Sequence, residues 1–230
     1  MTVDSLLNDF AIRSFRDQGD ADYISARMAL RAALVSPYLW ASQQTIEKYL
    51  KCILLLNRVP AKKVKHDLGA ALAAINVSGK LALDLTSPTQ KFIEYLDVYG
   101  RFRYLEISNH AFGRDIVTLD RAAWELRRFC TLGNAPERIR LREGVPAPKV
   151  RLPGGFLETI IDDVKNPARE PLLWQNGFFG KRVRRRVRVN GWFKASNSPL
   201  SLNPQILDEV LKYIFLPRDL VDGYRAHKNP

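Results

Sequence analysis

An arginine followed seven residues later by a histidine is the pair in this chain whose types and spacing best suit chemistry. Arg103 and His110 lie in the stretch from Tyr99 to His110. A guanidinium binds a phosphate through two parallel N–H donors, and an imidazole accepts or donates a proton near neutral pH. Cleavage of RNA by its own 2′-hydroxyl needs a proton acceptor, a proton donor and positive charge on the phosphate. The pair therefore predicts metal-independent cleavage of RNA rather than DNA, which lacks that hydroxyl.

The spacing of Arg103 and His110 limits how they could act together. In a continuous helix this separation places both side chains on one face, about 10 Å apart along the axis. One phosphate would then be reached by converging side chains or across a symmetric dimer interface. The alternative is chance, since the chain has 36 Lys and Arg residues, although it has only 3 His. We take Arg103 and His110 as the candidate catalytic residues.

A basic ribbon, defined as residues 181–189, is the second signal, and its sequence is Lys-Arg-Val-Arg-Arg-Arg-Val-Arg-Val. Alternate residues of a strand share a face, so a row of arginines could follow a phosphate backbone while a nearby aromatic ring stacks on a base. The alternative is a solvated hairpin face, or one that pairs with acidic side chains. The predicted nucleic-acid-binding residues are Arg101, Lys181, Arg182, Arg184, Arg186, Arg188 and Phe193.

The overall charge also favours an acidic partner. The formal net charge is +12, and residues 134–230 carry 18 Lys and Arg against 10 Asp and Glu. Nucleic acid is favoured over a membrane surface, because nothing amphipathic accompanies the basic ribbon. No Cys/His zinc spacing and no Gly-rich phosphate loop is present, so neither a metal nor a cofactor is predicted. Two isolated cysteines, the absence of a signal peptide and the lack of a long apolar run predict a cytoplasmic protein.

Helices predominate in the predicted secondary structure. Residues 5–57 have helical periodicity that is broken at Ser36-Pro37, Asp67 is placed to cap a helix, and Ser87 begins a predicted capping box with Gln90. A last helix of this block covers about 118–130, and its predicted apolar stripe consists of Leu119, Ala122, Leu126 and Phe129. The predicted fold class is mainly α, with a helix bundle over 1–133, a Pro/Arg-rich linker over 134–155 and a small basic α/β appendage over 156–230.

The appendage is expected to contain strands. Asn176-Gly177 and Asn190-Gly191 are both signals for two-residue hairpins, and the residues between them are rich in β-branched and aromatic types. We therefore expect a small three-stranded antiparallel β meander over roughly 172–197. Asn203-Pro204 then predicts the start of a C-terminal helix.

The run Gln43-Gln-Thr-Ile-Glu-Lys-Tyr-Leu-Lys51, followed by a basic loop and His66-Asp67-Leu68, resembles the HEPN family of helical domains. This resemblance covers about residues 20–133. It implies an up-down all-α bundle that is usually a homodimer. Many members are metal-independent ribonucleases with an arginine, four to six residues, and then a histidine, which is the pattern of Arg103 and His110. These motif residues could also serve only to solvate a face and cap a helix. Within the motif, Glu47 ahead of Lys51 has the favourable order for an i,i+4 ion pair.

The resemblance leaves two functions of different classes. One is an RNA-binding endoribonuclease of a defence or toxin–antitoxin type system. The other is a non-catalytic nucleotide-binding or protein-interaction module that acts with a separate protein partner. Tyr104 stands where active members usually have a small polar residue, and Phe112 stands where members paired with nucleotidyltransferases have a tyrosine. A purely structural interaction protein is a third alternative.

Overall fold

The structure is a computed structural model that describes residues 3–62, 64–100, 110–131, 155–180, 194–196, 207–212 and 218–228. In these residues the protein is mainly α-helical, as predicted, with two short strands. The helices are α1 (Val3–Ala11), η1 (Ile12–Arg16), α2 (Asp17–Arg31), α3 (Val35–Leu56), α4 (Leu68–Val77), α5 (Ser87–Tyr99), α6 (Asp115–Arg127), α8 (Phe156–Asp162), α9 (Arg169–Leu173), α10 (Leu207–Val210) and α11 (Arg218–Lys228). The strands are β1 (His110–Phe112) and β2 (Lys194–Ser196).

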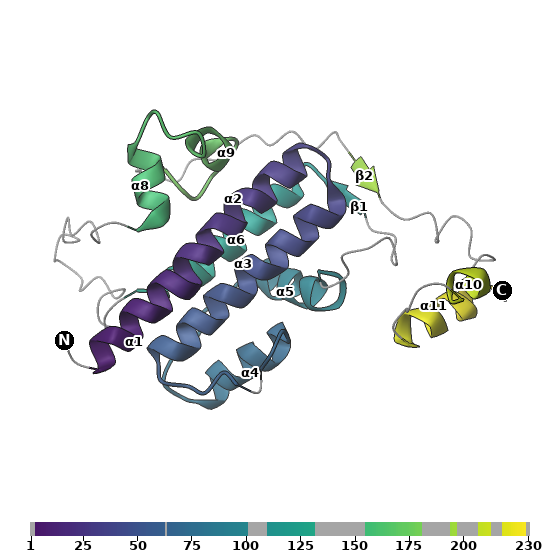
Figure 1. Ribbon diagram of the computed structural model, residues 1–230, viewed down its shortest axis with the longest axis horizontal. Helices are drawn as coiled ribbons and strands as arrows, with labels where there is room; N and C mark the ends of the chain where they lie inside the picture. Colours follow the sequence, from purple (N-terminus) through teal and green to yellow (C-terminus); the bar gives the residue numbers. More distant parts are fainter. Residues whose placement is uncertain are drawn as a thin grey trace.

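The bundle is built on two long helical segments that run side by side (Figure 1). The first comprises α1, the π-helical turn η1 and α2 without a break. It ends where Ala33 takes a φ of 59° and the Leu34 N–H donates to the Ala29 carbonyl at 2.8 Å. The second is α3, which begins at Val35 and has Pro37 in its first turn, where proline is tolerated. The break predicted at Ser36-Pro37 lies earlier, over residues 32–34, and the second helix begins one residue before Ser36.

Helix α3 forms the centre of the core. Ile46, Tyr49, Leu50 and Ile53 are fully buried, and α3 is in contact with α2, α4, α5 and α6. The stripe predicted for the last helix of the block is also buried, since Leu119, Ala122 and Leu126 of α6 have no exposed surface. Burial of these apolar side chains is the main stabilisation of such a bundle.

Two carboxylates cap the first turn of α4, and one of them belongs to α5. The predicted cap is confirmed, because the Asp67 carboxylate accepts from the Ala70 N–H at 2.6 Å. The Asp97 carboxylate of α5 accepts from the Leu68 N–H at 2.8 Å. The predicted capping box at Ser87 is wrong: the residue before α5 is Thr86, and its hydroxyl donates to Glu125 at 2.9 Å.

Residues 155–180 lie against the bundle through buried polar contacts. Arg127 of α6 reaches both Asp20 of α2 and Glu158 of α8, at 2.7 Å in each case. Arg27 of α2 is buried, contacts Asp120, and donates from Nε to the Pro171 carbonyl at 3.0 Å. A buried charge must be paired and hydrogen-bonded to be tolerated. These two arginines therefore fix α8 and α9 against α2 and α6.

The predicted β meander over 172–197 is not seen in the described residues. Residues 172–180 contain the end of α9 and a turn, and residues 181–193 lie outside the described part. Asn176-Gly177 makes no hairpin, because the buried Asn176 side chain accepts from the Phe178 N–H at 2.9 Å and donates to the Tyr23 hydroxyl at 2.8 Å. Strand β2 pairs antiparallel with β1 instead, with Ser196 opposite His110.

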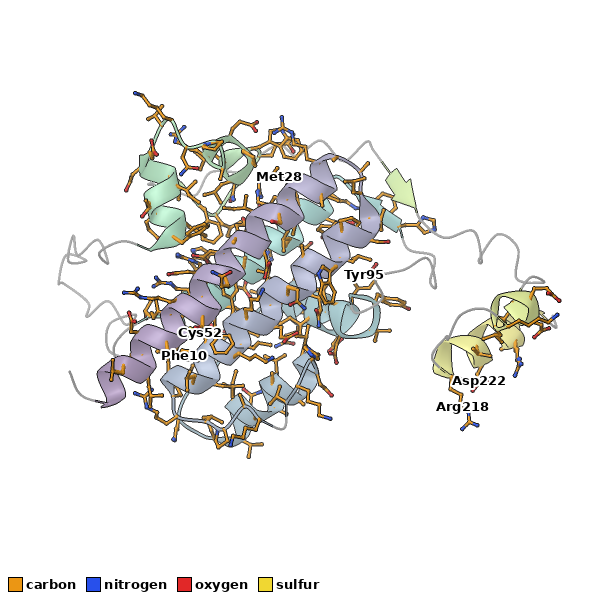
Figure 2. All side chains as sticks on the ribbon, viewed as in Figure 1. Phe10, Met28, Cys52, Tyr95, Arg218 and Asp222 are labelled. Carbon is orange, nitrogen blue, oxygen red and sulfur yellow. The ribbon has the colours of Figure 1, made fainter. Side chains whose placement is uncertain are left out.

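The C-terminal helices α10 and α11 are set apart from the bundle in Figure 1. The C-terminal helix predicted after Asn203-Pro204 corresponds to α10 from Leu207, followed by α11. Arg218 and Asp222 of α11 are labelled in Figure 2, one helical turn apart. Among the described helices, none is long and apolar enough to cross a bilayer. The domain limits at 133 and 155 fall at or within the undescribed stretch 132–154 and stay predictions.

Candidate nucleic-acid site beside His110

A pocket of about 410 Å³ opens next to β1. It lies between the first turns of α3, helix α5, β1 and the start of α6, and its size is within the range of small-molecule sites. The lining residues are Tyr38, Leu39, Pro88, Lys91, Phe92, Tyr95, His110, Phe112, Arg114, Asp115 and Thr118. His110, the predicted catalytic histidine, is therefore a pocket residue.

Three basic side chains line this pocket. His110 begins β1 and is exposed, Lys91 is exposed on α5, and Arg114 is exposed in the turn between β1 and α6. The Arg114 guanidinium lies 5.0 Å from the centroid of the Phe112 ring, within the range of a cation–π contact. Such an edge suits an anionic group such as phosphate.

Asp115 is the single acid among the pocket residues, and it holds the local backbone. Its carboxylate accepts from the Phe112 N–H at 2.8 Å, which closes the turn between β1 and α6. Burial raises the pKa of Asp115, while this backbone hydrogen bond and the charge of Arg114 act to lower it. The contact fixes the place of Arg114 relative to β1.

The wall of the pocket includes aromatic rings. Phe92 is buried, and Tyr95 and Phe112 are half-buried. Figure 2 labels Tyr95, whose ring lies 4.9 Å from that of Tyr99. Burial raises the pKa of Tyr95 to about 12, with Asp115 and Tyr99 adding to the effect, so its hydroxyl stays neutral at physiological pH. Rings of this kind can stack on a nucleobase.

A buried hydroxyl without a hydrogen bond of good geometry is part of the same site. Tyr38 is 2% exposed, and its hydroxyl, which interacts with the Ser42 hydroxyl one turn further along α3, makes no hydrogen bond of good geometry among the described residues. The buried Ser42 hydroxyl is in the same position. Burial raises the pKa of Tyr38 well above its ordinary value, so the group remains an O–H donor. An unsatisfied buried polar group costs about 1–3 kcal/mol, which a ligand atom could recover.

The other predicted site residues lie outside the described part of the chain. Arg101 and Arg103 belong to 101–109, and Lys181, Arg182, Arg184, Arg186, Arg188 and Phe193 belong to 181–193. Whether Arg103 shares the pocket with His110 therefore stays a prediction. The two ends of 101–109 are placed: a Cβ on Gly100 would lie 2.6 Å from Gln43 Cβ, and His110 stands at the pocket.

The motif residues on α3 and before α4 have clear structural contacts. Lys51 Nζ donates to Glu47 Oε1 at 2.6 Å, the i,i+4 pair that the sequence predicts. Gln43 Nε2 lies 3.4 Å from Glu47 Oε2. A further contact was not predicted: the His66 ring meets the same Glu47 carboxylate at 3.0 Å. From the sequence, His66 was interpreted only as a residue at the start of a helix.

Several pocket residues were missed by sequence reasoning. Tyr38, Lys91 and Arg114 come from three separate elements, and nothing in their local pattern distinguishes them from ordinary helix and turn residues. Arg114 follows His110 by four residues, which is the one sequence signal that could have found it. In the described ranges, no group of three or more His, Cys, Asp or Glu side chains is placed to hold a metal ion.

Comparisons with protein-family models, with curated proteins and with solved structures found no match for this chain.

Proposed function

We propose that this chain is a HEPN-like up-down helix bundle that binds RNA in the pocket beside His110 and cleaves it without a metal ion. One observation supports this most strongly: an exposed histidine stands at a nucleotide-sized pocket with Lys91 and Arg114. The resemblance at Gln43–Lys51 and at His66-Asp67 supports the assignment to a HEPN-like class of protein. The proposal includes a homodimer in the cytoplasm and a role in a defence or toxin–antitoxin type system.

The pocket chemistry suits one ribonucleotide of a strand. A base would stack on Phe112 or Tyr95, and its edge would take the hydrogen bond that the Tyr38 hydroxyl offers. The adjoining phosphate would lie between Lys91 and Arg114. The basic ribbon, with Phe193 and Arg101, would contact the rest of the strand.

Cleavage would proceed by attack of the 2′-oxygen on the adjacent phosphorus. His110 accepts the 2′-hydroxyl proton, the bond from phosphorus to the 5′-oxygen breaks, and the leaving oxygen takes a proton from water. The products are a 2′,3′-cyclic phosphate and a free 5′-hydroxyl. Arg103 supplies the fixed positive charge on the phosphate during the transition state.

The test is RNA cleavage by the full-length protein in the presence of EDTA. The parent should give 2′,3′-cyclic phosphate ends, and His110→Ala and Arg103→Ala should each lower the rate by at least about 100-fold. His227→Ala, a histidine of α11, serves as the matched control and should retain the parental rate. Equal rates for the parent and both variants, or no cleavage by the parent, would exclude the enzyme.

A non-catalytic nucleotide-binding module acting with a partner is the second candidate. The aromatic pocket and the Tyr38 hydroxyl, which makes no hydrogen bond of good geometry among the described residues, favour it independently of His110 chemistry. Tyr104, which stands where active members usually have a small polar residue, favours it as well. If the parent binds RNA or a mononucleotide in the pocket but cleaves nothing, this second function is the correct one.

A further inference from the structure

The His66 ring contacts a buried carboxylate through one nitrogen, while most of the ring is exposed to solvent. His66 Nδ1 lies 3.0 and 3.1 Å from the two oxygens of Glu47. The His66 side chain is 77% exposed, whereas that of Glu47 is 7% exposed. The buried carboxylate therefore holds an imidazole that projects into solvent.

The Glu47 contact determines which His66 nitrogen carries the proton. The carboxylate is an acceptor and already receives a hydrogen bond from Lys51 Nζ at 2.6 Å. The ring nitrogen facing it must therefore donate, so Nδ1 bears the hydrogen. In the neutral ring, Nε2 is then an acceptor, and the side chain that carries it is largely exposed.

Two lysines lie close to His66 in the sequence. Lys62 and Lys65 of the loop before α4 are exposed, and neither has an acidic partner in the described part of the chain. The Lys65 backbone is in the left-handed region, with a φ of 48°, directly before His66. A loop of this kind attracts a phosphate backbone, which places sugar hydroxyls within reach of the ring.

The His66 site and the pocket lie along the same side of the bundle. Strand β1 lies beside the first turns of α3 and α4 beside its later turns, with α5 between them (Figure 1). The pocket residue Leu39 and the tether residue Glu47 are both on α3, about 12 Å apart along its axis. That is farther than one nucleotide extends, so a strand seated in the pocket would meet His66 with another of its nucleotides.

We propose that the Glu47–His66 pair recognises RNA by its sugar: Nε2 of His66 accepts a hydrogen bond from a ribose 2′-hydroxyl while Lys62 and Lys65 hold the adjoining phosphates. The 2′-hydroxyl is the group by which a protein distinguishes RNA from DNA. Glu47 is a positioning residue, because it sets the tautomer that leaves Nε2 free to accept. This inference rests on the proposed function and adds the device that selects its substrate class.

The experiment compares binding of a short RNA with binding of the DNA of the same sequence. Groups of 2′-O-methyl at cleavable positions near the pocket prevent turnover, because they remove the attacking hydroxyl, and single 2′-deoxy substitutions are placed at the remaining positions. The parent should bind RNA more tightly than DNA. His66→Ala should lower that preference roughly five- to tenfold by weakening RNA binding and leaving DNA binding unchanged. One single 2′-deoxy substitution should cause the same loss in the parent and no further loss in His66→Ala.

A separate readout distinguishes sugar recognition from a structural role of His66. Long-range ¹H–¹⁵N spectra of the free protein should show His66 as the Nδ1–H tautomer, and Glu47→Ala should redistribute it and lower the preference for RNA. His227→Ala, the control, should leave the preference unchanged. If the parent prefers RNA and His66→Ala keeps that preference, this inference is overturned and the proposed function stands. If the parent binds no RNA, both are overturned.

Discussion

Arg127 of α6 donates from Nε to the buried carboxylate of Asp20 on α2 at 2.7 Å, with no exposed surface on the Asp20 side chain. Burial raises the pKa of Asp20, although the charge of Arg127 and its hydrogen bond act to lower it. The same guanidinium reaches Glu158 of α8. One arginine thus joins three helices, two of the bundle and one from the segment after residue 155.

Replacing this arginine by an apolar residue of similar length is the first test. Arg127→Met leaves the buried Asp20 without its cation, so the free energy of unfolding should fall by about 3–5 kcal/mol. Arg13→Met is the matched control, because Arg13 pairs with Asp9 at the surface with its side chain 77% exposed. The control should change stability by less than about 1 kcal/mol. Equal losses in chemical denaturation would contradict the buried linkage.

The contact with Glu158 should make the docking of α8 sensitive to acid. Burial works to raise the pKa of Glu158, but the hydrogen bond and charge of Arg127 outweigh it and hold that pKa below the ordinary 4.5. A carboxyl with a lowered pKa stabilises the fold above its unfolded value, and this contribution is lost as the pH falls through the lower folded value.

Glu158→Gln measures that contribution. The side chain is 40% exposed, so we expect the variant to be less stable than the parent by only about 1 kcal/mol at pH 7. Below the ordinary value of 4.5 the difference should shrink toward zero as the parental carboxyl also becomes neutral. Denaturation curves at pH 7 and at low pH test this, and a difference that grows on acidification would show that the sign is wrong.

Two tyrosines distinguish a hydroxyl available to a ligand from one that holds the fold. Tyr38→Phe removes a buried hydroxyl that makes no hydrogen bond of good geometry among the described residues, so stability should be unchanged or slightly raised. Nucleotide binding should weaken by up to about tenfold if the ligand bonds to that hydroxyl. Tyr23→Phe should instead lose about 1–3 kcal/mol of stability, because its hydroxyl donates to Asp120 at 2.6 Å. Melting curves and binding titrations measure these effects. A loss of stability in Tyr38→Phe and none in Tyr23→Phe would contradict the prediction.

The cations at the pocket predict a salt dependence. If Lys91 and Arg114 each contact a phosphate, the double variant to alanine should reduce the slope of log K against log salt by about 1.4 for single-stranded RNA. Alanine at two cations away from the pocket, Arg13 and Lys80, should leave the slope unchanged. Parallel slopes for the parent and the pocket variant would mean that neither pocket cation touches the strand.

Sequence patterns predicted the bundle well, because helix signals are local. The stripe at Leu119, Ala122 and Leu126 is buried, and Asp67 caps α4, as its position before Leu68 predicts. The β-hairpin predicted from Asn176-Gly177 was wrong, because the same dipeptide occurs in any tight turn. Here the amide is satisfied by Tyr23, which lies 153 residues away in sequence. Such a distant partner has no trace in local periodicity.

The candidate site was predicted in part. His110 was found from its type and its spacing to Arg103, and it lies at a pocket. Tyr38 and Lys91 join it only because α3 and α5 pack together, which no spacing in the chain reveals. Glu47 was assigned to Lys51 by the i,i+4 rule, and that pair is present. Its second contact, with His66, depends on how the loop before α4 folds back on α3.

The chain has only 3 His residues, so their side-chain signals offer the most direct test of the central claim that RNA binds beside His110. The imidazole ¹H–¹³C resonances of the full-length protein, assigned by His→Ala variants, are followed while a non-cleavable RNA is added. We predict a saturable shift of the His110 signal, with an affinity that Lys91→Ala plus Arg114→Ala weakens. An RNA that binds while the His110 signal stays unmoved would contradict it, as would the absence of binding.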